Sequence, residues 1–378
     1  MPDTDDTTSQ TTNTTGDAPH LSPGNDGSLR RAHIGRDELA LVLSRYDLGV
    51  IRSLRDYPRG SRRSPKVRLR SDRGEFILKR RAPGRGEPER LAFATSLYRR
   101  MIDQHFPLAP IFPTRDGGLA LRVDEKAYEL FEYVPGSRDD GGVPAATASG
   151  RTLGRLHALF SQTAPSTRPR QSSFHAARTV PVAVQRIPDA LAATGASESV
   201  CRAAASNGAT LVTAYAEARK TVDQAGYADL PEQPIHGDWH PGNLRYRNGE
   251  VVAVFDFDSA RLEPRIADVA NAALQCSLHA DSRGSDPRQW PESFEMRRIR
   301  ALIHAYNEAA DVPLSAAERT MLPWLIIEAL IAESVVPIAA HGRFGRLPGD
   351  AFLAMVTAKV NWLLPRADRV AARLADEA

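Results

Sequence analysis

Residues 235–243 read Ile-His-Gly-Asp-Trp-His-Pro-Gly-Asn, and residues 254–258 read Val-Phe-Asp-Phe-Asp. The first segment is rich in the Gly, Pro, Asp and Asn residues that form tight turns. The apolar run before Asp256 predicts a strand that delivers this acid beside the turn. We therefore expect Asp238, Asn243 and Asp256 to lie close together, with Asp238 and Asn243 presented on one side of the loop.

These three side chains have the chemical types that phosphoryl transfer from ATP requires. In such sites one Asp orients the acceptor hydroxyl and takes its proton, an Asn five residues later binds a metal ion, and a second Asp binds metal that bridges the phosphates. Asp238, Asn243 and Asp256 fit these roles in that order. Repulsion among the acids indicates a Mg²⁺ ion. Asp258, two residues further along the predicted strand, would share a face with Asp256 and add a metal ligand.

The pattern of His-Gly-Asp, Asn five residues after the Asp, and an apolar strand ending in Asp-Phe-Asp resembles the aminoglycoside phosphotransferase and choline kinase superfamily, which includes type II homoserine kinases. The resemblance covers residues 35–370 and is most specific over residues 235–258. It implies a protein-kinase-like bilobal α+β fold, with an antiparallel β-sheet N-lobe and a mainly helical C-lobe. It also implies ATP and Mg²⁺ as cofactors and a hydroxyl group as the phosphate acceptor.

A kinase also needs a lysine on an upstream strand to hold the ATP phosphates. Residues 67–70 alternate apolar and polar side chains, residues 71–74 read as a turn, and the strand that restarts after them ends at Lys79. Further upstream, Gly60 and Ser61 lie where a phosphate-covering loop belongs, and their N–H and hydroxyl groups can cap phosphate oxygens. The same two residues fit a plain hairpin turn equally well.

Residues 128–136 read as a buried strand that stops at Pro-Gly, and this segment resembles the hinge between the two lobes. We expect adenine to be held there by backbone groups of Glu132 and Val134, between apolar side chains from both lobes. An ordinary strand and turn would have the same sequence.

One position departs from the superfamily pattern. In the helix predicted over residues 89–101, Ala94 occupies the place of the Glu that orients the phosphate-binding lysine. Glu87 and Glu89 are the acids that remain nearby. The departure motivates an alternative function, a nucleotide-binding module without catalysis, although such a module would have little need of Asp238.

Two further alternatives stay open. The alternation His236-x-Asp238-x-His240, completed by Asp256, Asp258 or Asp268, would suit a metal-dependent hydrolase. Lys79 argues against it, because a hydrolase needs no such lysine, and we expect His236 and His240 to make structural hydrogen bonds. The other alternative is a Ser/Thr protein kinase of the same superfamily.

Composition divides the chain into three parts. Residues 1–33 are dominated by Thr, Asp, Ser, Asn and Gly up to Arg30 and predict a disordered acidic tail. Residues 34–134 form the predicted N-lobe with the nucleotide-binding sheet, and residues 135–378 the helical C-lobe with the catalytic loop and acceptor site. Helical periodicity over residues 150–159, 299–310, 321–336 and 352–364 supports the C-lobe assignment.

Charge and hydropathy narrow the class of partners. The net charge is +3, but basic residues crowd residues 52–85, where the scarcity of interleaved aromatic residues disfavours nucleic acid. The apolar stretch 322–340 contains Glu328, Glu333 and Pro337, so we expect a buried helix and no membrane partner. The two cysteines have no CxxC spacing and the N-terminus lacks a basic and apolar signal pattern, which favours the cytoplasm. The sequence gives no oligomeric state.

The acceptor is predicted only as a chemical class. Glu328 and Glu333, on an otherwise apolar helix, could bind an ammonium group, and Arg261 and Lys359 could bind a carboxylate. Together they suggest a small, amine-bearing alcohol. This class covers amino alcohols, hydroxy amino acids such as homoserine, and aminoglycosides.

Overall fold

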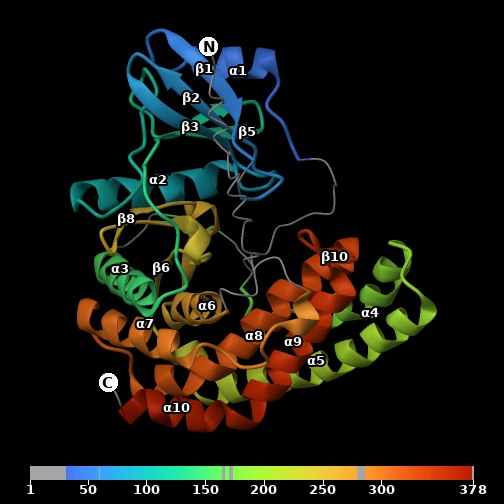
Figure 1. Cartoon of the computed structure of the whole chain (residues 1–378). Helices are drawn as coiled ribbons and strands as arrows, with labels where there is room; N and C mark the ends of the chain where they lie inside the picture. Colours follow the sequence, from blue (N-terminus) through green and yellow to red (C-terminus); the bar gives the residue numbers. More distant parts are fainter. Residues whose placement is uncertain (1–30, 59, 164–166, 170–172, 279–285, 377–378) are drawn as a thin grey trace, which may run out of the picture.

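The computed structural model describes residues 31–58, 60–163, 167–169, 173–278 and 286–376. Its N-terminal part is a five-stranded antiparallel sheet in the order β1-β2-β3-β5-β4, preceded by α1 (Arg36–Leu43) (Figure 1). The strands are β1 (Ile51–Asp56), β2 (Lys66–Ser71), β3 (Gly74–Arg80), β4 (Leu121–Val123) and β5 (Lys126–Glu132). Helix α2 (Pro88–Asp103) follows β3 and lies between this sheet and the helical part of the molecule.

Side-chain alternation sets the two faces of the sheet. In β2, Val67 and Leu69 are buried in a small core with α1, while Lys66 and Arg68 project to the other face. Lys79 in β3 pairs with Lys66 across the ladder, so it shares that second face. The hairpin predicted to end at Lys79 is therefore present, and its lysine lies on the face away from the small core.

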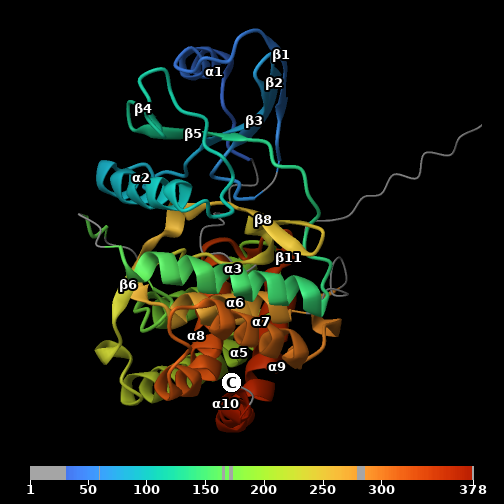
Figure 2. The same cartoon turned by 90° about the vertical axis from the view of Figure 1, so that its left-hand side faces the viewer.

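The C-terminal part is mainly helical and also carries short two-stranded sheets (Figure 2). Its helices are α3 (Val143–Ser161), α4 (Thr179–Ala192), α5 (Glu198–Gln224), α6 (Ile266–Ser277), α7 (Met296–Ala309), α8 (Ala316–His341), α9 (Gly349–Leu363) and α10 (Ala367–Asp376). The two-stranded sheets pair β6 (Glu232–Ile235) with β9 (Arg261–Pro264), β7 (Leu244–Arg247) with β8 (Glu250–Val254), and β10 (Arg343–Phe344) with β11 (Leu347–Pro348).

Close helix packing in this part depends on glycine. A Cβ atom added at Gly150 of α3 would lie 2.0 Å from the carbonyl oxygen of Leu302 in α7, and one at Gly154 would lie 2.6 Å from that of Tyr306. Only hydrogen fits at these positions, so the two helices approach each other backbone to backbone. Helix α7 in turn packs on α6, whose first turn carries Asp268.

Helix α8 is long and apolar enough to cross a membrane by length and composition, and 94% of its most apolar window is buried inside the structure. It contains the apolar stretch 322–340, so the prediction of a buried helix is confirmed. It is the one helix of this kind among the residues that the structure describes. Its N-terminus carries a capping box formed by Ser315 and Glu318, which satisfies the first backbone N–H groups.

The structure confirms the predicted α+β arrangement and differs at two boundaries. The strand expected over residues 128–136 ends at Glu132, and the predicted division after residue 134 falls in the connection between β5 and α3. The strand before Asp256 ends at Val254, so Asp256 and Asp258 are not on a strand. The predicted acidic tail lies outside the described residues except for its last three positions.

Candidate active site

The loop that follows β6 is held by a single buried carboxylate. Asp268 accepts hydrogen bonds from the backbone N–H groups of His236 (2.6 Å) and Gly237 (2.8 Å), and a third from Nε2 of His157 (3.3 Å). Burial would raise the pKa of Asp268, but the His157 hydrogen bond and nearby positive charge lower it, so this carboxylate stays ionised. Asp268 therefore braces the loop, and its carboxylate oxygens are engaged in hydrogen bonds within the protein.

Glycine is required at the turn of this loop. Gly237 has φ +74°, and an added Cβ would lie 2.3 Å from the carbonyl oxygen of Ser259. His236 uses both ring nitrogens in structural hydrogen bonds: Nε2 donates to the Phe255 carbonyl (2.9 Å), and Nδ1 accepts from the Asp238 N–H (3.2 Å). His236 thus joins the loop to the end of β8 and has no lone pair left for a metal.

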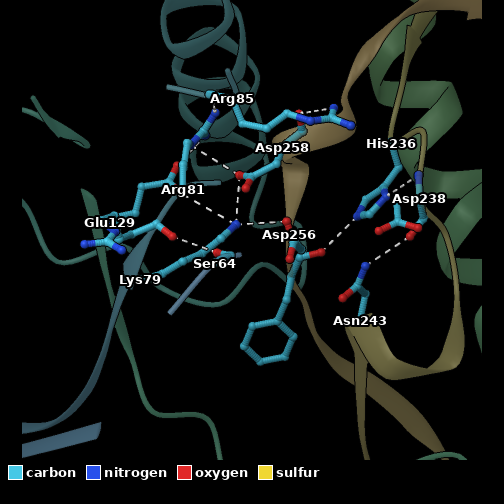
Figure 3. Close-up of polar contacts among 12 residues, drawn as sticks. Ser64, Lys79, Arg81, Arg85, Glu129, His236, Asp238, Asn243, Asp256 and Asp258 are labelled. Carbon is cyan, nitrogen blue, oxygen red and sulfur yellow. Dashed lines mark hydrogen bonds and ion pairs between the residues drawn. The ribbon is translucent and has the colours of Figure 1, made fainter. Parts of the chain in front are cut away.

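Asp238 and Asn243 face each other across this loop (Figure 3). Asn243 Nδ2 donates to the backbone carbonyl of Asp238 (3.0 Å), which leaves the Asn243 Oδ1 oxygen as an acceptor. His240 Nδ1 accepts the Gly242 N–H (3.0 Å), while its Nε2 lies 3.7 Å from Asp238 Oδ2. Burial and the neighbouring His236 lower the pKa of His240 to about 3, so His240 is neutral near Asp238.

Asp256 begins a turn and has an unusual backbone. Its φ of +68° lies in the left-handed region, which is strained for a residue other than glycine. A 3₁₀ turn, Phe257–Ser259, follows it. The Phe257 ring packs edge-on against Tyr98 of α2 (5.5 Å between centroids) and lies 4.5 Å from the His236 ring. These aromatic contacts fix the turn, so the strain at Asp256 is held in place by packing on both sides.

Lys79 joins the sheet to this turn. Its Nζ lies 2.8 Å from Asp256 Oδ1 and 2.8 Å from Asp258 Oδ1, so both carboxylates point at one ammonium (Figure 3). The 3₁₀ turn brings the two acids together in place of the strand that the spacing predicted. Burial alone would lower the pKa of Lys79, but the facing carboxylates outweigh it and raise the pKa. The same ammonium holds the pKa of Asp256 far below its usual range, against the effect of burial.

The group that orients Lys79 comes from a strand and not from α2. Ala94 is buried, and the exposed Glu87 pairs with Arg90 (3.4 Å). Glu129 of β5, fully buried, stands opposite Lys79 in the β3–β5 register, with Oε2 3.9 Å from Nζ. Glu87 and Glu89, the acids that the sequence left as candidate partners of Lys79, are both exposed.

Arg81 completes this buried cluster. Its Nη2 lies 2.5 Å from Glu129 Oε1, and its Nε lies 3.2 Å from Asp258 Oδ1. Arg85 donates to the Asp258 carbonyl (3.1 Å). Sequence reasoning missed Arg81 and Glu129. The visible indication was a lone acid in the middle of the apolar strand 127–131, which can be buried only beside a cation.

The predicted phosphate loop and hinge have defined backbones. Gly60 has φ +71°, and the Ser61 hydroxyl accepts the Arg63 N–H (3.2 Å). Arg31 donates to the carbonyl oxygens of both Gly60 and Ser61 (3.2 Å each), so the loop is tied to the start of the described chain. In the hinge, the Glu132 N–H donates to the Pro110 carbonyl (2.8 Å), which leaves only its carbonyl for a nucleotide; Val134 follows the end of β5.

The oxygen donors of Asn243, Asp256 and Asp258 fit a hard divalent cation such as Mg²⁺. Among the described residues, no group of three or more His, Cys, Asp and Glu side chains could hold a metal ion by itself. The remaining ligands would come from phosphate oxygens and water, as in phosphoryl-transfer sites. This donor set does not favour the hydrolase alternative, because His236 has both ring nitrogens engaged.

Three features together are typical of a protein-kinase-like phosphotransferase. They are the antiparallel N-terminal sheet, the loop held by Asp268, and the pair of acids that contact Lys79. A sequence model described as "Phosphotransferase enzyme family" matches residues 57–323, and the chain belongs to that family. It is a kinase-type phosphotransferase of the aminoglycoside phosphotransferase and choline kinase superfamily, as the motif predicted.

Similar proteins span most of the chain. A homoserine kinase of Phenylobacterium zucineum is 27% identical over 298 residues, which is 76% of this chain and 80% of the relative. Among solved structures, a microcompartment-associated aminopropanol kinase has a TM-score of 0.66 at 17% identity, covering 88% of this chain and 98% of the other. An amicoumacin kinase in complex with AMP-PNP, Ca²⁺ and Ami has a TM-score of 0.58 at 13% identity, covering 87% of this chain and 96% of the other. At these identities the two structures show the shared fold.

Proposed function

We propose that this protein transfers the γ-phosphate of ATP to a hydroxyl group of a small, amine-bearing acceptor, with Mg²⁺ as the metal. The observation that carries the proposal is the position of Lys79, 2.8 Å from both Asp256 and Asp258 and beside the loop that carries Asp238 and Asn243. No other described lysine joins two carboxylates from a separate part of the chain.

Lys79 would bind the α- and β-phosphates. Asn243, Asp256 and Asp258 would hold Mg²⁺, which neutralises the charge that develops on the transferred phosphoryl group. Lys79 neutralises Asp256 and Asp258, the two acids that would hold the metal, so its ammonium would become available to the phosphates if a metal took its place beside them. The loop at Gly60 and Ser61 would cover the phosphates. Backbone groups of Glu132 and Val134 would hold adenine.

Asp238 would orient the acceptor hydroxyl and accept its proton. Its carbonyl is held by Asn243 and its N–H by His236, so the side chain leaves a fixed backbone. Neutral His240 beside it adds no positive charge that would compete for the carboxylate. Phosphoryl transfer has a loose transition state, so positioning and charge neutralisation would supply most of the catalysis.

Glu333 is the best candidate for recognition of the acceptor amine. Of the four acceptor residues that the sequence suggested, three are engaged. Glu328 pairs with His175 (3.0 Å), Arg261 with Glu263 (2.6 Å), and Lys359 donates to two backbone carbonyls (2.8 and 2.9 Å).

Glu333 accepts a hydrogen bond from Gln275 Nε2 (3.1 Å), and no ion pair joins it to a cation in the described part of the chain. Burial, and then the charge of Asp238, raise the pKa of Glu333 strongly, which places this acid within the electric field of the proposed catalytic Asp. An acceptor ammonium group beside Glu333 would relieve both effects. The names of the similar homoserine and aminopropanol kinases refer to small amine-bearing alcohols and support the same class.

Calorimetric titration with a non-hydrolysable ATP analogue tests the nucleotide half of the proposal. We expect binding that requires Mg²⁺ and that Lys79→Ala weakens by at least about tenfold. No binding under any condition would refute it. ATP-consumption assays with homoserine, 1-amino-2-propanol and an aminoglycoside then test the acceptor class, and the matching alcohols without an amine serve as controls. Glu333→Gln should raise the KM for the amine acceptor and leave the KM for ATP unchanged.

A further inference from the structure

A second lysine lies beside Lys79 on the same face of the sheet. Lys66 is the first residue of β2 and stands directly opposite Lys79 in the β2–β3 register. Opposed residues of an antiparallel pair project to the same face. The next residue, Val67, points the other way into the small core with α1. The Lys66 side chain therefore runs along the face that carries the proposed phosphate-binding lysine.

The Lys66 ammonium lies next to the turn at Gly60. A Cβ atom added at Gly60 would lie 2.9 Å from Lys66 Nζ, and the φ of +71° there already favours glycine. Gly60 belongs to the connection between β1 and β2, which is the predicted phosphate-covering loop. A cationic group supplied by the sheet therefore lies next to this loop.

Lys66 has no carboxylate within 4 Å among the described residues, whereas Lys79 has three. Lys126 pairs with Glu38 (3.1 Å), and Lys359 is bonded to backbone carbonyls. Burial lowers the pKa of Lys66, and the strongest opposing influence is the charge of Asp256. A partly buried ammonium without a close counter-ion is costly unless an anion joins it. Asp256 is near enough to act on Lys66, but Lys79 already neutralises it.

We propose that Lys66 binds the β- and γ-phosphates of ATP as a second cation beside Lys79. The inference rests on the proposed function, because it takes a nucleoside triphosphate as the ligand. Two features select that end of the nucleotide. The ammonium lies next to the loop that would cover the phosphates, and it is within the electrostatic influence of Asp256, a proposed metal ligand. Lys66 would thereby favour ATP over nucleotides with fewer phosphates.

Titration of variants tests the proposal. Dissociation constants are measured for a non-hydrolysable ATP analogue and for AMP in wild type, Lys66→Met, Lys66→Arg and Lys220→Met. The last variant is the matched control, because Lys220 is an exposed lysine on α5. Lys66→Met should weaken the ATP analogue about tenfold or more and AMP less than twofold, since a hydrogen bond to a charged group contributes about 1.5–3 kcal/mol. Lys66→Arg should restore part of the loss. Equal weakening of both nucleotides, or affinities equal to those of Lys220→Met, would overturn the proposal.

Lysine labelling of the wild-type protein gives a second test that needs no substitution. The rate of reductive methylation is followed at each lysine by mass spectrometry with the ATP analogue, with inorganic triphosphate, or with adenosine. The analogue and triphosphate should slow modification of Lys66 several-fold, adenosine should not, and Lys220 should be unaffected throughout. A Lys66 rate that the ATP analogue leaves unchanged would refute the inference. If wild type binds no ATP analogue at all, the proposed function fails; if it binds and Lys66 is unaffected, only this inference fails.

Discussion

Replacing Glu129 by Gln removes one charge from the buried cluster that orients Lys79. Glu129 is fully buried, lies 2.5 Å from Arg81 Nη2 and 3.9 Å from Lys79 Nζ, and is one of three carboxylates facing two cations. Removing one partner of a buried ion pair costs about 3–5 kcal/mol, because the other charge stays buried. Gln keeps the shape and one acceptor oxygen, so we expect a loss near the lower value, about 3 kcal/mol.

The measurement is urea-induced unfolding of Glu129→Gln beside Glu125→Gln, an exposed residue in the preceding turn. Glu125→Gln should change the free energy of unfolding by less than about 0.5 kcal/mol. Affinity for the Mg²⁺-bound ATP analogue should also fall about tenfold in Glu129→Gln, because Lys79 loses a group that positions it. A double-mutant cycle with Arg81→Met should give a coupling energy of about 2 kcal/mol. If Glu129→Gln unfolds like Glu125→Gln, or if the coupling is below about 0.5 kcal/mol, the cluster does not hold Lys79 as we argue.

Three further predictions use separate parts of the structure. Asp238→Asn should lower kcat by about 10²–10⁴-fold with nucleotide affinity nearly unchanged, whereas Asp256→Asn should weaken Mg²⁺-dependent nucleotide binding itself; equal loss of binding in both would contradict the division of roles. Because the folded protein raises the pKa of Glu333 above 4.5, it binds more protons than the unfolded chain, and stability falls as pH rises above that value. Glu333→Gln should therefore raise the melting temperature more at pH 8 than at pH 5, and a uniform shift would argue against a buried, protonated acid. Gly150→Ala should destabilise the protein by about 1–3 kcal/mol, since its Cβ would meet the backbone of α7, while Gly35→Ala, where an added Cβ meets no atom within 4 Å, should cost only the N-cap preference of α1, about 0.5 kcal/mol, in the same unfolding assay.

The sequence predicted the fold where local pattern and chemistry agree. The alternation of residues 67–70 and the following turn located the hairpin that ends at Lys79, and helical spacing located α3, α7, α8 and α9. Family membership, and with it the sheet-plus-helices architecture, was predicted from the resemblance of residues 235–258 to a known superfamily. These parts could be predicted because each depends on residues that are close together in the chain.

The parts that sequence reasoning missed depend on contacts between distant segments. Asp256 and Asp258 both contact the Lys79 ammonium because Asp256 has a left-handed backbone conformation and begins a 3₁₀ turn. The spacing of side chains in the sequence does not predict such a backbone. The partner of Lys79 could not be found by searching α2, because strand register, set by the whole sheet, places Glu129 opposite Lys79. Likewise, the loss of Glu328 as an acceptor candidate follows from its pairing with His175, 153 residues away in the chain.

The partner of Lys79, Glu129, lies on a strand and not on a helix, and this affects how the site would respond to helix movement. In protein kinases the Lys–Glu pair forms only when the helix carrying the Glu is correctly placed, and movement of that helix controls activity. Here Lys79 and Glu129 belong to adjacent strands of one ladder, so backbone hydrogen bonds fix their spacing. Helix α2 reaches the site through an apolar contact, Tyr98 on Phe257. A displacement of α2 would therefore act on the turn that carries Asp256 and would leave the Lys79–Glu129 pairing intact, so helix movement would change the proposed metal ligands and not the lysine.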